Sequence, residues 1–286
     1  MGVVLITGCS SGFGMLAAVR LAGGGHTVYA TMRNMEKKGD LLAEAERHGV
    51  DIHLLRLDVV DDISISECIN QIESDEGELH VVINNAGYGI AGFFEDLTEN
   101  EVKEQFETNF FGVQKVIRHS LPLMRKSSET GGKCKIINIS SVAGRSPVPG
   151  LSAYTASKFA LEGFSESLYH ELQPFGIQVV LVEPGAYSTK IFTENSQRAE
   201  GIGRDGSVYT DYSIRFQERV KRLMKSKEMR DPEEVAALIE KIVNSDSPKL
   251  RYLIGSQVRL RSFFRWILPS PKYSALLRKA MFGKTD

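Results

Sequence analysis

The sequence predicts an α/β fold in which a mainly parallel sheet is doubly wound, with helices on both faces. Three observations predict it. Residues 3–7 form a short apolar run at the start of the chain, a glycine-rich turn follows directly, and similar apolar runs then alternate with helical patterns as far as residue 182. Because a helix between two neighbouring strands acts as a crossover, this alternation makes the strands parallel.

Size and composition narrow the class of protein. The chain of 286 residues is long enough to bury a sizeable core, and its net charge of -1 gives no general attraction for nucleic acid. Cys9, Cys68 and Cys134 show neither metal nor disulfide spacing, which favours a reducing, cytoplasmic setting. No basic n-region precedes the first strand, and no run approaches the ~18 apolar residues of a membrane span.

The glycine-rich turn has the spacing G-x-x-x-G-x-G, with glycines at Gly8, Gly12 and Gly14. A turn between a buried strand and a helix aims backbone N–H groups and the helix dipole at a pyrophosphate. The alternative is a plain turn. The strand-to-helix context at the start of the chain favours a dinucleotide site, and no P-loop lysine is present.

The second predicted strand, residues 27–31, leads to Arg33. At this place an acidic residue favours a free ribose 2′-hydroxyl, whereas an arginine favours a 2′-phosphate. We therefore expect NADP(H) rather than NAD(H), with Ser10 as a further hydroxyl donor. The alternative is an exposed arginine on a turn.

Helices are predicted at residues 36–48 and 63–73, and each is followed by a strand, at residues 52–57 and 79–83. A polar motif comes directly after each of these two strands. Asp58 either accepts a hydrogen bond from the adenine amino group or caps the following helix. Asn85, Ala86 and Gly87 are small residues that let the backbone approach a ligand at the carboxyl edge of the sheet, or they form an ordinary turn.

A long helix is predicted over residues 99–124, with Asn109 inside it. Asparagine is a poor residue for a helix interior. It indicates a local kink, or a water held by freed backbone groups, unless it is merely tolerated there.

Tyr154 and Lys158 lie four residues apart in a predicted helix and therefore share one face. A nearby ammonium makes a phenol easier to ionise, although poising a tyrosine near neutral pH requires about 4 kcal/mol. Ser141, at the end of the strand predicted over residues 136–139, could donate a hydrogen bond to the same reacting oxygen. The three indicate a proton-transfer site for a carbonyl or an alcohol, unless the pair is simply a solvated helix face.

Together these pieces resemble the short-chain dehydrogenase/reductase family, over about residues 2–190. The thirteen-residue step from Ser141 to Tyr154 is usual in that family and selects Ser141 over Ser140. The resemblance is carried by an ordered set of motifs, namely Thr7-Gly8-x-x-x-Gly12-x-Gly14, Asn85-Ala86-Gly87, Asn109, Ser141, Tyr154-x-x-x-Lys158 and Pro184-Gly185.

The resemblance implies a catalytic set. Tyr154 would be the general acid/base, and Lys158 would lower its pKa and bind the nicotinamide ribose. Ser141 would orient the substrate oxygen, and Asn109 would hold a water in a proton relay through Lys158.

The resemblance also implies how the cofactor is held. Asp58 and Val59 would flank the adenine, Asn85 would lie near the adenosine ribose, and Thr189 would meet the carboxamide. The remaining residues expected at the cofactor are Gly8, Ser10, Ser11, Gly12, Phe13, Gly14, Ala86, Gly87, Pro184 and Gly185.

By the same resemblance we expect one catalytic domain over residues 1–286, with a Rossmann-type sheet in the order 3-2-1-4-5-6-7. The strings at residues 28–33 and 156–163 look most like the hydroxysteroid and retinol dehydrogenase branch. That branch suggests a bulky apolar alcohol or ketone as substrate, steroid-, retinoid- or lipid-like. A homodimer or homotetramer is usual in the family.

The second half holds two less regular segments, on either side of a helix beginning near residue 231 and a last strand at 250–254. Residues 186–230 lose their periodicity and contain Gly201, Gly203, Gly206, Phe192, Tyr209 and Tyr212. In the family this segment is a lid over the substrate, although an ordinary surface excursion is the alternative. Residues 256–286 interleave apolar and basic side chains against a single acid, Asp286. They could lie on an anionic membrane surface, pack on the domain, cap the substrate pocket or meet a second subunit.

The expected chemistry is hydride transfer between NADP(H) and a carbonyl or secondary alcohol. A non-catalytic NADP(H)-binding regulator is a rival from another class, but a pure sensor has no need of Ser141, Tyr154 and Lys158. An epimerase or dehydratase that uses the nucleotide as an internal redox shuttle is a second rival.

Overall fold

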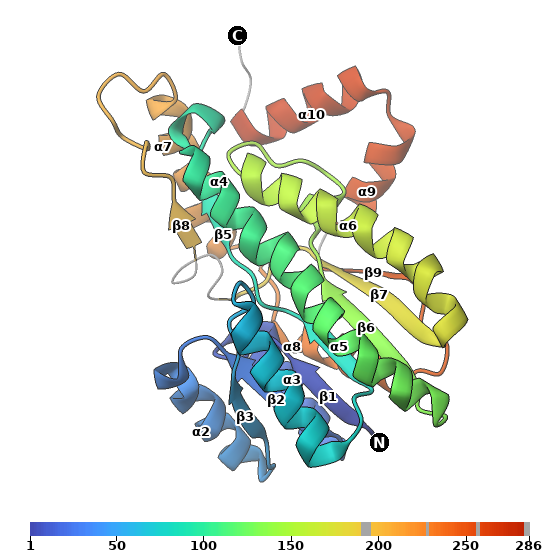
Figure 1. Ribbon diagram of the computed structural model, residues 1–286. Coiled ribbons are helices and arrows are strands. Elements are labelled where there is room, and N and C mark those ends of the chain that lie inside the picture. Colours follow the sequence, from blue (N-terminus) through green and yellow to red (C-terminus); the bar gives the residue numbers. More distant parts are fainter. Residues whose placement is uncertain (190–195, 227–228, 256–257, 283–286) are drawn as a thin grey trace.

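A seven-stranded parallel sheet forms the centre of the computed structural model, which describes residues 1–189, 196–226, 229–255 and 258–282. Its order is β3-β2-β1-β4-β6-β7-β9 (Figure 1). The predicted order is confirmed, because β5 and β8 pair with each other outside this sheet. The seven strands are β1 (Val3–Ile6), β2 (Thr27–Met32), β3 (His53–Arg56), β4 (Val81–Asn84), β6 (Cys134–Ile139), β7 (Ile177–Pro184) and β9 (Arg251–Ile254).

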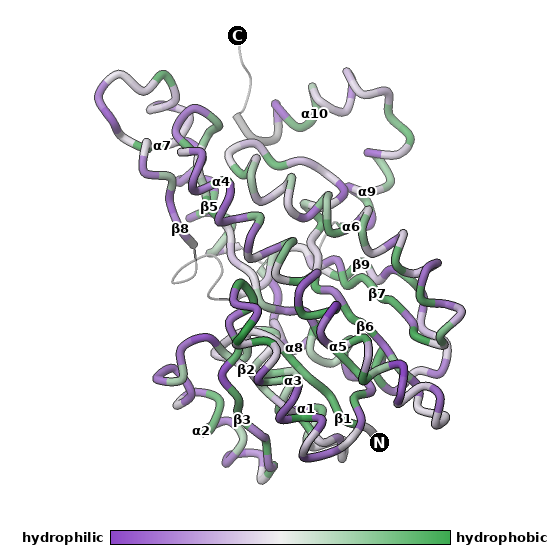
Figure 2. Tube along the Cα trace, viewed as in Figure 1, coloured by the Kyte–Doolittle hydropathy of each residue, from purple (hydrophilic) through white to green (hydrophobic). Residues whose placement is uncertain are grey.

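Two apolar layers enclose the sheet. Val3 and Leu5 of β1 face a core shared with α3, α5 and α6, whereas Val4 and Ile6 face one shared with α1, α2 and α8. A strand buried on both faces is apolar along its whole length, as the trace of β1 shows in Figure 2. The helices of the two layers are α1 (Gly12–Gly23), α2 (Gly39–His48), α3 (Asp62–Glu76), α5 (Gly112–Glu129), α6 (Ser152–Leu172) and α8 (Glu233–Val243).

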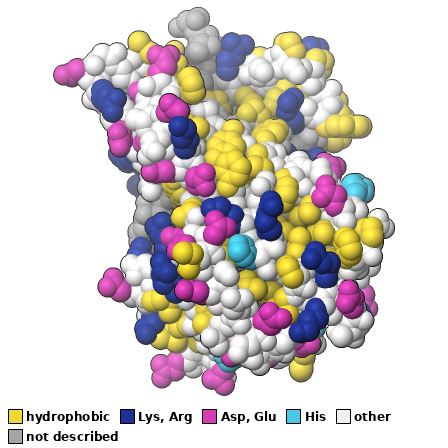
Figure 3. Space-filling model, viewed as in Figure 1, with side chains coloured by type: hydrophobic (Ala, Val, Ile, Leu, Met, Phe, Trp, Pro, Cys, Tyr) yellow, Lys and Arg dark blue, Asp and Glu magenta, His cyan; other side chains and the backbone are white. Residues whose placement is uncertain are grey.

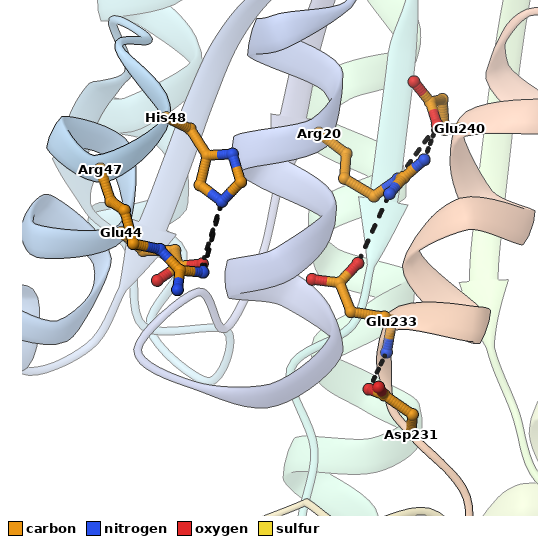
Figure 4. Close-up of polar contacts among 7 residues, drawn as sticks. All are labelled: Arg20, Glu44, Arg47, His48, Asp231, Glu233 and Glu240. Atoms are coloured by element: carbon orange, nitrogen blue, oxygen red, sulfur yellow. Dashed lines mark hydrogen bonds and ion pairs between the residues drawn. The ribbon is translucent and has the colours of Figure 1, made fainter.

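Surface ion pairs lie both between helices that are far apart in the sequence and within single helices. Arg20 of α1 bonds Glu240 of α8 at 2.7 Å and lies 3.5 Å from Glu233, while on α2 Glu44 contacts Arg47 and His48 (Figure 4). Exposed pairs of this kind contribute about 0–1 kcal/mol each, so apolar burial rather than these contacts stabilises the two layers.

The predicted long helix is interrupted where Asn109 lies. α4 (Glu99–Phe106) leads into a π-helical turn (Glu107–Phe111) before α5 begins, and α5 continues to Glu129. The predicted distortion is therefore confirmed. Elsewhere the strands agree with their predicted ranges within two residues. Short 3₁₀ turns lie at Met35–Lys38, Phe94–Asp96, Val142–Gly144 and Gln173–Phe175.

Three features were not predicted. β5 (Gly89–Ala91) and β8 (Ser196–Arg198) form a small parallel sheet, and α7 (Thr210–Met224) occupies most of the second part of the lid segment. The tail consists of two helices, α9 (Val258–Ile267) and α10 (Ser270–Phe282). Within the lid segment, residues 190–195 (Phe192 among them) and 227–228 lie outside the described residues. In the tail the same is true of 256–257 and 283–286.

Candidate active site

The glycine turn, the Asn85–Gly87 segment, Ser141 and the Pro184–Gly185 pair lie where β1, β4, β6 and β7 end, at the carboxyl edge of the sheet. The packing around individual glycines shows which segments touch. A Cβ atom built on Gly8 would lie 2.8 Å from Cα of Ala86, and one built on Gly12 would lie 3.6 Å from Thr189. The glycine turn, the Asn85–Gly87 segment and Thr189 therefore form one side of the site.

The glycine turn has the shape of a phosphate cradle. Gly8 and Gly12 adopt left-handed φ values of 73° and 61°, and a Cβ atom on Gly14 would lie 2.6 Å from the Gly8 carbonyl oxygen and overlap the Asn85 amide. Ser11 precedes the first turn of α1, and its side chain makes no cap hydrogen bond. The N-terminus of α1 and the Ser11 hydroxyl thus fit a dinucleotide pyrophosphate.

Asn85 braces this turn from the neighbouring strand. Its side-chain nitrogen donates to the carbonyl oxygens of Thr7 and Gly8, each at 2.9 Å. The Thr7 hydroxyl oxygen in turn accepts from the N–H groups of Asn85 and Ala86, each at 3.0 Å. The sequence did not reveal the bracing role of Thr7. The expected contact of Asn85 with the adenosine ribose stays a prediction, and the amide nitrogen is already bonded to the turn.

Arg33 lies exposed immediately after β2, and within the described ranges nothing forms a hydrogen bond or ion pair with its guanidinium. Asp58 is half-buried and accepts from the Val60 N–H at 3.3 Å, while Asp61 rather than Asp58 caps α3. Val59 is buried against Gly112. Arg33 and Asp58 therefore remain candidates for the adenosine end.

Tyr154 and Lys158 share one face of α6, as predicted. Nζ of Lys158 lies 5.8 Å from the centroid of the Tyr154 ring and donates to the Ile139 carbonyl oxygen at 2.8 Å. A Cβ atom on Gly89 would lie 3.5 Å from the Tyr154 ring. One on Gly87 would lie 3.9 Å from Nζ of Lys158, so the Tyr154–Lys158 pair adjoins the segment that follows β4.

Ser141 follows β6 and begins a short 3₁₀ turn, where its hydroxyl oxygen accepts from the Ala143 N–H at 3.1 Å. Burial raises the pKa of Tyr154, and a hydrogen bond with Ser141 opposes the rise. Burial also lowers the pKa of Lys158 to about 8, against the influence of Glu162.

The raised pKa of Tyr154 belongs to the protein without nucleotide, and the expected acidification by Lys158 together with a positively charged nicotinamide ring stays a prediction. In the protein alone, loss of hydration around the phenol outweighs the influence of neighbouring groups. The Lys158 ammonium is bonded to a backbone carbonyl, and its own pKa is lowered by the same burial.

Asn109 is fully buried in the π-helical turn. Its side-chain oxygen accepts from the Tyr88 N–H at 3.1 Å, and its nitrogen donates to the Tyr88 carbonyl at 2.9 Å and to Ser157 at 3.3 Å. The side chain thus ties Tyr88 to the helix. The relay water through Lys158 stays a prediction and would have to use backbone groups of the π turn.

A buried charge cluster adjoins Lys158, and sequence analysis missed it. Glu162, one helical turn beyond Lys158, and the fully buried Glu183 of β7 both approach Nε of Arg251, at 3.3 and 3.4 Å. Arg145 lies 3.6 Å from Glu183. Burial raises the pKa of Glu183 to about 7 and also raises that of Glu162. The sequence did offer one signal for this cluster, namely the acidic residue Glu183 near the end of a mostly apolar strand.

The segment of residues 186–230 contacts the loop between Ser141 and Tyr154, which is called the catalytic loop below because it joins these two candidate residues. A Cβ atom on Gly150, between Ser141 and Tyr154, would lie 3.2 Å from the Phe216 ring of α7. Tyr209 stacks on Phe93 with ring centroids 4.9 Å apart, and Tyr212 meets the same ring at 6.1 Å.

Two of the other expected cofactor residues make contacts within the protein. Phe13 packs edge-on against Tyr187. The N–H group of Gly185, which follows Pro184, donates to the Ile254 carbonyl oxygen at 2.8 Å.

A strand–glycine-turn–helix cradle beside a serine, a tyrosine and a lysine defines the class of this protein. The short chain dehydrogenase family model matches residues 2–200, and the chain belongs to the short-chain dehydrogenase/reductase family. It is an oxidoreductase that acts on CH–OH or C=O groups.

Three relatives extend the comparison. An uncharacterized oxidoreductase, YusZ, of Bacillus subtilis is 41% identical over 284 residues, 98% of this chain and 99% of its own length. The 3-ketodihydrosphingosine reductase of Bacteroides thetaiotaomicron is 41% identical over 261 residues, 90% and 89% of the two chains. Human retinol dehydrogenase 8 is 38% identical over 256 residues, 87% and 79% of the two chains, so the relatives include the predicted retinol dehydrogenase branch.

Solved structures agree with the fold. A short-chain dehydrogenase from Streptomyces avermitilis superposes with a TM-score of 0.77 at 31% identity, covering 98% of this chain and 100% of its own. Actinorhodin polyketide ketoreductase with NADPH gives 0.75 at 26%, covering 90% and 97%. A family member from Burkholderia phymatum with NAD gives 0.77 at 25%, covering 94% and 96%. A nicotinamide cofactor is thus typical, and both forms occur among these neighbours.

Proposed function

We propose that the protein is an NADP(H)-dependent oxidoreductase that transfers a hydride to or from a carbonyl or secondary alcohol of a bulky apolar substrate. The placement of Ser141, Tyr154 and Lys158 beside a glycine cradle carries this proposal. The candidate cofactor residues named above are proposed to contact the nucleotide.

The protein's own groups would move the proton. The bound nicotinamide supplies or accepts the hydride. Tyr154 delivers the proton to the substrate oxygen during reduction, while Ser141 donates a hydrogen bond to that oxygen. Lys158 holds a positive charge close to the phenol, with its Nζ 5.8 Å from the centroid of the Tyr154 ring.

NADP(H) is proposed over NAD(H) because of Arg33. A charge-assisted hydrogen bond contributes about 1.5–3 kcal/mol, so Arg33→Ala should weaken NADPH about 10- to 100-fold and leave NADH nearly unchanged. Binding is measured by titration of each nucleotide. Arg47→Ala, an exposed arginine on α2, is the matched control and should alter neither. Equal losses for both nucleotides in Arg33→Ala would show that Arg33 does not recognise the 2′-phosphate.

The substrate is proposed to be steroid-, retinoid- or long-chain lipid-like. The aromatic packing of the lid segment supports an apolar ligand, and two relatives are named for a sphingoid ketone and for retinol. The test mixes purified protein with NADPH and a panel of aldehydes and ketones that includes these three classes, and follows the nucleotide's absorbance.

The same panel separates the rival functions. Net consumption of NADPH that is lost in Tyr154→Phe supports the reductase. Turnover without net consumption would favour an epimerase or dehydratase. Tight NADPH binding with no turnover across the panel would favour a non-catalytic regulator.

A homodimer or homotetramer is part of the proposal. Phe111 and Phe159 are 42% and 40% exposed on the helices that carry Asn109 and Tyr154. Figure 3 shows apolar side chains grouped on the face that α4, α5 and α6 form. Sedimentation of wild type against Phe111→Ser with Phe159→Ser tests it, and an unchanged mass would remove this interface.

Localisation is proposed as cytoplasmic, with peripheral membrane contact through residues 256–286. Cys9, Cys68 and Cys134 are all buried and free, in keeping with a reducing compartment. Across the part of the chain that the structure describes, no helix combines the length and apolar character needed to span a bilayer.

A further inference from the structure

The tail helix α9 exposes the face that a helix ordinarily buries. Leu260, Phe263, Phe264 and Ile267 have the i, i+3, i+4, i+7 spacing of a core-facing stripe, yet they are 54%, 53%, 36% and 50% exposed. Trp266 beside them is 85% exposed. These five residues are referred to below as the α9 apolar face.

This orientation is set by contacts on the opposite side of the tail. Val258 and Tyr273 are buried, at 2% and 3% exposure. Nε of Arg261 donates to the Ser146 hydroxyl at 2.8 Å, its Nη2 donates to the Pro147 carbonyl at 2.9 Å, and Tyr273 also bonds Ser146. Because the polar anchors hold α9 against the domain, its apolar face points outward.

The charged side chains of the two tail helices all have one sign. Residues 258–282 contain six basic and no acidic residues, so they leave -7 on the rest of a chain whose net charge is -1. Four of the six are exposed: Arg259, Lys272, Arg278 and Lys279. A second copy docked through this surface would bring like charges together, whereas an anionic surface would complement them.

We propose that α9 and α10 form a docking surface for an anionic lipid bilayer, with the α9 apolar face in the headgroup region and the exposed cations on lipid phosphates. The inference deepens the proposed function, because Ser146 and Pro147 lie in the loop that joins Ser141 to Tyr154, and α10 lies against α7 of the lid. A bilayer seated there adjoins the catalytic loop, where a membrane-dissolved substrate would need to enter.

Trp266 is the only tryptophan in the chain, so its emission reports on this surface alone. The full chain is titrated with vesicles of phosphatidylglycerol and phosphatidylcholine in equal parts, or of phosphatidylcholine alone, without substrate or nucleotide. We expect a blue shift and quenching by brominated acyl chains with the anionic vesicles, and a much weaker response with the neutral ones. No shift and no quenching with anionic vesicles would overturn the proposal.

Two triple variants distinguish vesicle binding through this surface from non-specific attraction between exposed cations and anionic vesicles. Lys272→Gln with Arg278→Gln and Lys279→Gln should weaken vesicle affinity about fivefold per charge removed, near 100-fold together. Lys37→Gln with Lys38→Gln and Arg47→Gln removes three exposed cations far from the tail and should leave affinity unchanged. Equal losses in both variants would refute a specific surface.

A second copy of the chain is the competing occupant of the α9 apolar face. A blue shift that grows with protein concentration in the absence of vesicles would assign the face to a protein contact and overturn the proposal. Turnover of a water-soluble ketone with NADPH is measured in parallel. Retained turnover without vesicle binding would refute the docking surface while leaving the proposed function intact.

Discussion

The two halves of the sheet's carboxyl edge differ in the charge and size of the groups that form them. The half after β1 and β4 consists of backbone and small neutral side chains, with Gly8 and Gly14 in contact with the Asn85–Gly87 segment. The half after β6 and β7 buries charge, with Lys158, Glu162 and Glu183 behind the catalytic loop. The first should therefore be sensitive to added volume and the second to changed charge.

The largest expected effect tests the charged half. Tyr154→Phe keeps the ring and removes only the proton donor, so kcat should fall about 10²- to 10⁴-fold while NADPH affinity is retained. Single-turnover kinetics and nucleotide titration measure the two. Tyr169→Phe, on the same helix, is the matched control. Retained turnover in Tyr154→Phe would remove Tyr154 as the acid/base.

Glu183 should make stability depend on pH. Its pKa is raised from 4.5 to about 7, so the folded state binds the proton more tightly than the unfolded chain does. The resulting stability is complete below pH 4.5 and is lost as pH rises through about 7, by about 3 kcal/mol relative to Glu183→Gln.

Denaturant unfolding of wild type and Glu183→Gln across this pH range measures the difference. Glu166→Gln is the control, because Glu166 meets the same Arg251 but its side chain is 56% exposed and its pKa is lowered. A constant difference between wild type and Glu183→Gln would show that Glu183 does not titrate in this window.

Added volume should disturb the neutral half. Gly14→Ala brings a Cβ atom against the Gly8 carbonyl and the Asn85 amide. We expect a loss of about 1–3 kcal/mol in unfolding free energy and weaker NADPH binding. Gly163→Ala, in α6 with no atom within 4 Å of the added carbon, should instead stabilise by up to about 1 kcal/mol. The same change of Tm in both variants would contradict the crowding argument.

The smallest effect is a shift of a pH profile. Glu162 raises the pKa of Lys158, which burial lowers to about 8. Glu162→Gln should therefore move the alkaline limb of kcat/KM to lower pH, by up to about one unit. Glu166→Gln should leave it in place. An unmoved limb in Glu162→Gln would mean that Glu162 does not support the charge on Lys158.

Much of the neutral half could be predicted because the sequence patterns that indicate it involve residues close together in the chain. The spacing of Gly8, Gly12 and Gly14 reflects backbone conformations that a few neighbouring residues set, and Asn109 marked the distorted helix. The pairing of β5 with β8 could not be predicted. Each has only three residues, and they meet across more than a hundred positions of chain.

The sequence by itself determined the class of fold, the order of the strands and the family, because periodicity and turn chemistry are properties of short stretches. Only the tertiary structure decided how charge is arranged around Lys158 and which way the tail faces. Glu162, Glu183 and Arg251 come from a helix and two strands, and the α9 apolar face points outward because distant loop residues hold its other side. Burial and electrostatic energy depend on neighbours in space, and the order of residues along the chain does not specify them.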